Sequence, residues 1–344
     1  GYDVSGIDGY SISWDSSSAT VPGGTKTSEE TTHDATSSVL ADGGSYYFHI
    51  RARDNALNWN ATATHFGPIK IDTTAPNSLS LSINSGDAYT NSASVTLTVT
   101  ASDPSPGSGI AKAAFSNDGT SWSGWEDYSA SRAGWDLTDS KYGANNSDGT
   151  KSVWARVMDG VGHEIAANLR ASDSIFLDRV APSGLSIVVN DGATYATSSD
   201  VSLKLAASDA DPASGLWTMA LSNDGSAWSG WMDWSQAASW SLVTGAGGTD
   251  TDGDRTVYFK VQDHATNVGG PVSDGIFLDR KSPENLSVKI NGGATYTNSS
   301  TVDLTIDAND PIPGSTVSEM TVANAESSLG TWEAYASSKS GWSL

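Results

Sequence analysis

Aspartates recur at a short junction that the chain carries three times. The junction reads Ile-Asp-Thr-Thr-Ala-Pro at 71–76, Leu-Asp-Arg-Val-Ala-Pro at 177–182 and Leu-Asp-Arg-Lys-Ser-Pro at 278–283. Each copy ends a predicted strand, presents an acid and then adds a proline that cannot continue a strand ladder. In a seven-strand β-sandwich the first strand begins at the end where the loops between strands B and C and between F and G turn. We therefore expect three groups of acids: Asp72, Asp103 and Asp159; Asp178, Asp209, Asp211 and Asp263; and Asp279 and Asp310.

Carboxylates gathered at one end of a domain repel one another unless a cation lies among them. Calcium prefers such oxygen ligands, about six to eight of them, completed by carbonyls and water. These acids are therefore predicted Ca²⁺ ligands that would stiffen the junctions. The alternative stays open that they are turn residues bonded to their own backbone, because Asp and Asn favour loops and Asp-Pro opens turns.

A second acidic loop, Asp250-Thr-Asp-Gly-Asp254, is similar to the start of an EF-hand calcium loop. It lacks the twelfth-position glutamate and the flanking helices of that motif. The corresponding stretch one repeat earlier is Asn145-Asn-Ser-Asp-Gly149. We interpret both as turns between strands E and F, with a bound cation as the alternative.

Tryptophan is abundant, with 13 residues concentrated around 122–135, 228–240 and 332–342. In a cysteine-free sandwich, large aromatic side chains are expected to fill the space between the sheets. The motif Trp-Ser-Gly-Trp occurs at 122–125 and 228–231, and residues three apart on a regular strand face opposite sides. Trp125 and Trp231 are therefore candidate glycan contacts, with core or hairpin packing as the other interpretation.

No catalytic motif occurs in the sequence. It contains no Gly-x-Ser-x-Gly, Walker loop, Gly-x-Gly-x-x-Gly or His-Glu-x-x-His, and the five histidines are scattered. We expect no enzymatic activity. Four sequons could be glycosylated in a host with the machinery, and are otherwise Asn-rich turns: Asn60, Asn145, Asn285 and Asn298.

The elements that must position these residues are short strands. The junction prolines recur about every hundred residues, which is one small β-domain per repeat. Alternation and β-branched residues predict strands A to C in the first complete repeat near 79–83, 95–101 and 110–116. An Asn-Asp-Gly turn at 117–119 leads to a strand C′ carrying the tryptophans, followed by strands E, F and G near 135–137, 152–159 and 174–177. The fold class is all-β, a tandem array of seven-stranded sandwiches, without a credible helix.

Four domains follow from this spacing. Residues 73–178 and 179–279 are complete repeats, residues 1–72 hold strands C to G, and residues 280–344 hold strands A to E. An incomplete sandwich exposes sheet edges and half a core. The chain is either a window on a longer array, or its end domains are completed by neighbouring copies through strand exchange. The two partial domains do not add up to one sandwich by strand exchange, because both are expected to contain strands C, C′ and E.

The amino-acid composition disfavours several classes of binding partner. The formal net charge of −22 disfavours nucleic acid and anionic membranes, which require a basic face. The sequence has no cysteine, so a disulfide framework is excluded, and no apolar run is long enough to span a membrane. Residue 1 is glycine rather than methionine, and we expect a processed or excised piece of a longer protein.

The repeats resemble the Ig-like repeats of large bacterial and archaeal cell-surface proteins. The shared pattern includes Asp-Thr-Thr-Ala-Pro at the junction, Ser-Asn-Asp-Gly-x-x-Trp-Ser-x-Trp at 116–125 and Asp-x-Ala-x-Asn at 263–267. Residues 1–72 look like the fibronectin type III variant of the group. The resemblance implies sandwich folds, an extracellular cell-surface location and Ca²⁺-stiffened junctions.

We therefore expect a non-enzymatic structural segment of a cell-surface stalk, filament, adhesin arm or S-layer. Its partners would be other copies or segments of the same surface protein. The alternative is a carbohydrate-binding accessory module that holds surface glycans on exposed tryptophans.

Overall fold

The computed structural model describes residues 5–32 and 34–344. The described chain is built from β-strands joined by turns and short 3₁₀ segments, and it contains no α-helix. None of its helical segments is long and apolar enough to cross a bilayer. The chain divides into two compact units, Gly1–Ala88 with Ser92–Leu177 and Tyr89–Asn91 with Asp178–Leu344.

The N-terminal part of the first unit is a single sheet in the order β2-β1-β3-β4. Its strands are β1 (Ile7–Asp15), β2 (Ser28–Glu29), β3 (Ser45–Asp54) and β4 (Thr64–Lys70). They correspond to strands C, C′, F and G. Between β2 and β3 the described residues form no strand, so the expected strand E is not seen there.

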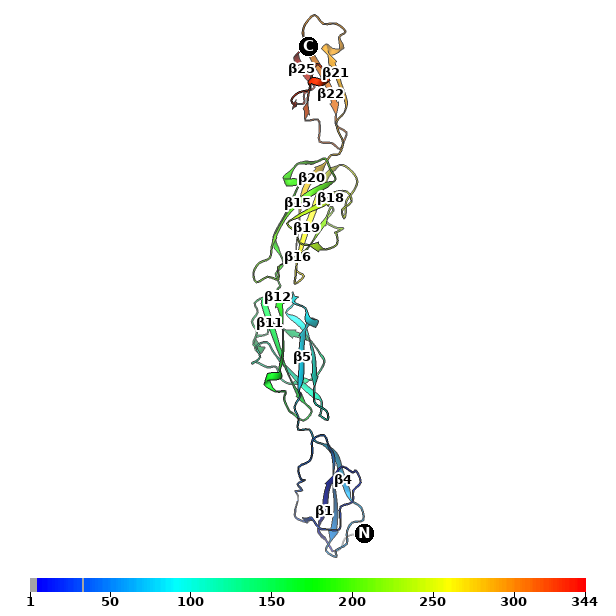
Figure 1. Ribbon diagram of the computed structural model, residues 1–344, viewed down its shortest axis with the longest axis vertical. Helices are drawn as coiled ribbons and strands as arrows, with labels where there is room; N and C mark the ends of the chain where they lie inside the picture. The colour runs from blue at the N-terminus through cyan, green and yellow to red at the C-terminus, as the bar shows by residue number, and fades with distance from the viewer. Residues whose placement is uncertain (1–4, 33) are drawn as a thin grey trace. The chain divides into compact units, whose positions relative to one another are not determined.

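The first complete repeat is a two-sheet sandwich (Figure 1). One sheet has the order β10-β7-β5, and in the other β12, β11, β8 and β9 are neighbours. The bounds are β5 (Ser78–Ile83), β6 (Tyr89–Thr90), β7 (Ser94–Ser102), β8 (Ile110–Ser116), β9 (Glu126–Asp127), β10 (Ser131–Asp136), β11 (Gly149–Asp159) and β12 (Ala171–Leu177). Alternate residues of these strands, including Leu97, Phe115, Trp135 and Val153, form the buried core.

The second complete repeat has the same order, with sheets β13-β15-β18 and β14-β20-β19-β16-β17. Its strands are β13 (Ser183–Val189), β14 (Tyr195–Ala196), β15 (Asp200–Ser208), β16 (Leu216–Ser222), β17 (Met232–Asp233), β18 (Ala237–Ser241), β19 (Gly253–Asp263) and β20 (Val268–Leu278). The short β14 pairs in parallel with β20, whereas the other ladders are antiparallel. Strand A is thus split between the two sheets, and the tandem β-sandwich prediction is confirmed.

Residues 280–344 form one three-stranded sheet and one two-stranded pair, β21-β22-β25 and β23-β24. The bounds are β21 (Glu284–Ile290), β22 (Thr301–Asn309), β23 (Glu319–Met320), β24 (Glu333–Ala334) and β25 (Ser338–Ser343). These are strands A, B, C, C′ and E. Only Val302, Leu304 and Ile306 of β22 form a buried cluster in this part.

The repeats share local turn chemistry. Strand A ends in a 3₁₀ turn whose first asparagine has positive φ and accepts a backbone hydrogen bond from strand B, as when Asn84 Oδ1 accepts from Thr96 N at 3.0 Å. The turn after β8 is closed by Asp118, whose carboxylate accepts from the backbone N–H of Thr120 and Ser121. Gly119 follows with φ of +74°, a left-handed conformation that glycine adopts without strain.

Candidate metal centre

Asp178, Asp209 and Asp263 converge at the start of the second complete repeat. Asp178 directly follows β12, Asp209 directly follows β15, and Asp263 is the last residue of β19. Each offers a carboxylate oxygen, and these oxygens all lie within 4.8 Å of one another. Asp178 and Asp263 have no exposed surface. The residue that follows β12 and the ends of two strands of the second repeat therefore bring three acids from distant parts of the chain into one cluster.

Backbone groups satisfy most of these carboxylate oxygens. Asp178 accepts from Ser214 N at 2.7 Å, and Asp263 accepts from the backbone and side-chain amides of Asn267 at 2.8 and 2.9 Å. Oδ2 of Asp209 accepts from Gly215 N at 2.8 Å. Oδ1 of Asp209 is buried and has no hydrogen-bond partner among the described residues.

Burial is the largest cause that raises the pKa of Asp209 and of Asp263. The negative charge of Asp178 raises the pKa of both further. Both effects disfavour the ionised form, and a cation among the oxygens would reverse them. Asp211, two residues beyond Asp209, is exposed and lies outside the cluster.

The junction before the first complete repeat is built differently. Asp72 and Asp159 cluster with His163 rather than with a third carboxylate. Nδ1 of His163 lies 2.9 Å from Oδ2 of Asp159 and 3.1 Å from the carbonyl oxygen of Thr74. Because a carbonyl only accepts, this nitrogen carries the hydrogen. Burial alone would lower the pKa of His163. The hydrogen bond to Asp159 and the negative charge of that carboxylate outweigh burial, so the pKa of His163 is raised.

Asp72 is held in its ionised form. Its carboxylate accepts from Ser108 N at 2.7 Å and from Thr74 N at 3.1 Å. These bonds, those from Ser108 first, lower the pKa of Asp72 to about 2. Asp103 is not a member of this cluster. Its hydrogen bonding is the same as that of Asp209 in the next repeat: Oδ2 accepts from Gly109 N, and Oδ1 is buried without a hydrogen-bond partner among the described residues.

His163 belongs to the cluster with Asp72 and Asp159, although no sequence motif predicts it there. It stands four residues after Asp159, where the second repeat has Asn267 four residues after Asp263. Both side chains donate to the preceding aspartate and so hold the loop between F and G. Aligning the two loops, rather than looking for a second histidine, gives the signal.

At the third junction, Asp279 and Asp310 retain the same bonds. Asp279 accepts from Ser315 N and Asp310 accepts from Thr316 N, both at 2.7 Å. Burial opposes ionisation of Asp279, but the bonds from Ser315 outweigh it and lower its pKa. Oδ1 of Asp310 is buried without a hydrogen-bond partner, as in the two earlier repeats.

Two of the three acids in the turn at 250–254 pair with an arginine of the same chain. Arg280 reaches Asp250 at 2.7 Å and Asp252 at 2.6 Å. The hydrogen bond from Arg280 is the largest cause that lowers the pKa of Asp252. The corresponding Asn145 accepts from Nζ of Lys151 at 2.9 Å, which favours the interpretation of both stretches as turns.

The Trp-Ser-Gly-Trp motifs sandwich a cation instead of pointing to opposite sides. The guanidinium of Arg156 lies 4.6 Å from the ring centres of both Trp122 and Trp125. In the second repeat, Lys260 lies 4.1 Å from Trp228 and 5.2 Å from Trp231. The prediction that C′ carries these tryptophans is wrong, because β9 and β17 begin just after Trp125 and Trp231. The rings lie in an irregular segment that lets both face the same residue of strand F.

A third set of tryptophans lies in the core or packs against it. Trp135 is 2% exposed, and its Nε1 donates to Oδ1 of Asn117 at 2.7 Å. Trp240 repeats this bond to Asn223 at 2.9 Å. The candidate glycosylation sites lie elsewhere, all on exposed residues: Asn60, Asn145, Asn285 and Asn298.

No protein-family model matches the chain, and no curated protein matches it. Among solved structures, the fibronectin(III)-like modules of Clostridium thermocellum CbhA are 14% identical, covering 58% of this chain and 93% of theirs at a TM-score of 0.36. A Ca²⁺-stabilized ice-binding adhesin of an Antarctic bacterium is 16% identical, covering 77% of this chain and 66% of its own at 0.35. The D00–D0 domain of intimin is 12% identical, covering 58% and 98% at 0.24.

The repeats of this chain are of the Ig-like and fibronectin III-like kind. Their strand order, with A, B and E in one sheet and G, F, C and C′ in the other, is the observation that decides this. Likeness at this level carries no argument about function, which depends on the sites themselves.

Proposed function

We propose that this chain is a non-enzymatic structural segment of an extracellular cell-surface protein. In this proposal the Asp178, Asp209 and Asp263 cluster binds Ca²⁺ and stiffens a repeat junction. Tandem sandwiches and the strongly acidic composition support a surface stalk, filament, adhesin arm or S-layer component. Its partners would be other segments or copies of the same surface protein.

The observation that carries the metal proposal is Oδ1 of Asp209, a buried carboxylate oxygen without a partner beside two other buried carboxylates. An unpaired buried polar atom costs free energy, and like charges this close repel. The donor set is all oxygen, which suits Ca²⁺ better than metals that prefer nitrogen or sulfur. Carbonyl oxygens and water would complete the coordination.

Such an ion would act mechanically. Asp178 is the first residue after β12, whereas Asp209 and Asp263 belong to the second complete repeat. A bound ion would therefore fasten the incoming chain to that repeat and restrict bending at the junction. At Asp72 and Asp159, His163 already supplies a hydrogen-bond donor, so we expect weaker dependence on calcium there.

Calorimetric titration of the full chain with Ca²⁺, with thermal melting and small-angle scattering in Ca²⁺ and in EDTA, tests this proposal. We expect heat of binding, a higher Tm and a more extended, stiffer particle in Ca²⁺. Asp178→Asn should abolish these changes, whereas Asp211→Asn, in the same region but exposed, should retain them. Absence of binding heat together with identical melting and scattering would refute the calcium role.

A second candidate function is glycan binding through Trp231, which is 45% exposed. One face of this ring is directed to Lys260, and the remaining exposed surface would stack on a sugar. Binding on a glycan array that is lost in Trp231→Ala and retained in Trp125→Ala, where the ring is less exposed, would support it. No binding by the native chain would exclude it.

A further inference from the structure

Two histidines that are 16 residues apart in the sequence meet on the N-terminal sheet. His49 of β3 and His65 of β4 are directly opposite one another in the antiparallel ladder, so their side chains lie on the same face. Nδ1 of His49 is 2.7 Å from Nδ1 of His65. The two rings are steeply inclined, at 73°, with their centres 4.9 Å apart. Strand pairing therefore directs two imidazole nitrogens at one another.

The tautomer of this pair follows from Asp15 of β1. Its Oδ1 accepts from the backbone N–H of Ser17 at 2.8 Å and lies 3.2 Å from Nε2 of His49. Because a carboxylate only accepts, Nε2 of His49 carries a hydrogen. In the neutral ring Nδ1 then bears a lone pair, which accepts the hydrogen from Nδ1 of His65. His49 has no exposed surface, so its ring is fixed between Asp15 and His65.

A metal-binding histidine is held in the same way. Such a histidine usually donates its second N–H to a carboxylate or carbonyl oxygen, which fixes the tautomer and the direction of the lone pair. Asp15 already does this for His49. His65 is exposed, so an ion can reach the pair from solvent. The hydrogen on Nδ1 of His65 can be lost to solvent while Nε2 takes one up, so binding needs no net release of protons.

The separation of the two nitrogens indicates which metal geometry the pair suits. With metal–nitrogen bonds of about 2.0–2.1 Å, two ligands are about 3.3–3.4 Å apart at a tetrahedral angle and about 2.8–3.0 Å apart at a right angle. The observed 2.7 Å is closer to the second range. Right angles between ligands are typical of square-planar and tetragonal sites, which Cu²⁺ and Ni²⁺ favour. Of these two ions, Cu²⁺ binds nitrogen ligands more tightly.

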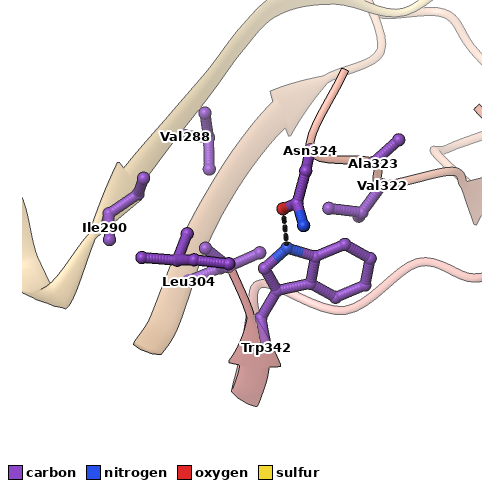
Figure 2. Close-up of a pocket in the computed structure, with 8 residues that line it drawn as sticks. Val288, Ile290, Leu304, Val322, Ala323, Asn324 and Trp342 are labelled. Atoms are coloured by element: carbon purple, nitrogen blue, oxygen red, sulfur yellow. Dashed lines mark hydrogen bonds between the residues drawn. The ribbon is translucent and has the colours of Figure 1, made fainter. Parts of the chain in front are cut away.

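Other candidate sites in the described residues have a different chemistry. The carboxylate cluster of the second complete repeat offers oxygen atoms alone, which suits Ca²⁺. The hollow that Figure 2 shows is lined mainly by apolar side chains. The amide of Asn324 there already accepts from Nε1 of Trp342 at 2.6 Å and donates to the carbonyl oxygen of Ser343 at 2.8 Å. The histidine pair therefore suits an ion that neither of these places would select.

We propose that His49 and His65 bind Cu²⁺ through their Nδ1 atoms, with water at the remaining positions. The ion takes the place of the hydrogen that the two rings share, and Asp15 acts as a positioning residue for His49. A bound ion joins β3 to β4 on the polar face of the sheet, since Phe48 and Ile50 point to the other side. The proposal does not depend on the calcium role, because the acid clusters contain neither histidine.

Electron paramagnetic resonance of the full chain, titrated with CuCl₂ in excess Ca²⁺, tests this site. We expect the tightest Cu²⁺ to show two imidazole nitrogens. His65→Ala changes an exposed residue, so folding should persist. It should leave at most one nitrogen and weaken binding at least about tenfold, because losing a ligand costs more than losing its supporting partner. His264→Ala removes an exposed histidine outside the pair and should bind copper like the native chain.

Asp15→Asn tests the positioning role separately. This variant keeps both ligands, so the two-nitrogen spectrum should persist while the affinity falls about 10- to 100-fold. Hydrogen exchange gives an independent readout: Cu²⁺ should slow exchange in Ser45–Asp54 and Thr64–Lys70 of the native chain but not of His65→Ala. A native spectrum without two nitrogens, or a copper affinity that His65→Ala leaves unchanged, would overturn the proposal. The second result would assign the copper to other groups of the chain.

Discussion

Replacing Asp209 with asparagine should have opposite effects with and without calcium. The change removes one of three clustered charges and keeps an oxygen that can accept from Gly215 N. The new amide group can donate to the neighbouring carboxylates, where Oδ1 of Asp209 has no partner. We therefore expect Asp209→Asn to stabilise the calcium-free chain and to weaken calcium binding.

The magnitude follows from the spacing of the cluster. At 4.8 Å, two unit charges repel by about 1 kcal/mol in water and about 3.5 kcal/mol at an effective dielectric constant of ~20. Because water and the surrounding dipoles screen this repulsion, we expect a gain of about 1–2 kcal/mol in the absence of calcium. For a domain of this size that is a Tm increase of at least about 4 °C.

In saturating calcium, the native chain should have a higher Tm than the Asp209→Asn variant. At a free concentration about 100 times the Kd, a ligand that binds only the folded state adds about 2.7 kcal/mol to the native chain. The variant should gain little, so its Tm should fall below that of the native chain in saturating Ca²⁺. Calorimetric melting of both proteins in EDTA and in Ca²⁺ measures this crossing, with Asp211→Asn as an exposed control that changes neither curve. A variant that melts lower under both conditions, or that gains as much from calcium as the native chain, would contradict the reasoning.

Three further predictions concern the complete repeats. Because the folded pKa of Asp72 lies near 2, below the ordinary value of about 3.9, its stabilising contribution is present above pH ~4 and lost as pH falls toward 2, which acid melting of native and Asp72→Asn chains measures. Arg156→Gln should cost about 1–2 kcal/mol of unfolding free energy by denaturant titration, whereas Arg156→Lys should retain most of it, as the lysine of the next repeat does. Trp135→Phe should cost about 1–3 kcal/mol by the same assay, because it leaves a void and an unpaired Asn117 oxygen.

The orientation of the Trp122 and Trp125 rings could not be predicted from the two-residue period of a β-strand. Spacing of three predicts opposite faces only on a regular strand, and residues 122–125 lie outside the strands. Arg156, more than 30 residues away in sequence, draws both rings to one side. Local pattern could not predict this, because the partner is supplied by a neighbouring strand of the sheet.

The acid clusters were partly predictable from the sequence, because the acids lie at strand ends and the ends of strands can be predicted. Alternating apolar residues define where strands end, and strand order then places Asp178, Asp209 and Asp263 at one end of a sandwich. The exposed Asp211, two residues away, could not be separated from them by sequence, because small turns decide which loop carboxylate faces inward. The histidine beside Asp159 likewise became meaningful only when its hydrogen bonds were visible.

The all-β class and the approximate positions of most strands in the two central repeats could be predicted from the sequence alone, because they follow from local hydrophobic alternation and turn residues. The tertiary structure alone decided which side chains meet. It showed Oδ1 of Asp209 buried without a hydrogen-bond partner among the described residues, and it showed Arg280 paired with Asp250 and Asp252. Those features depend on contacts between residues far apart in the chain, and burial and pairing are properties of the packed sheets rather than of any short segment.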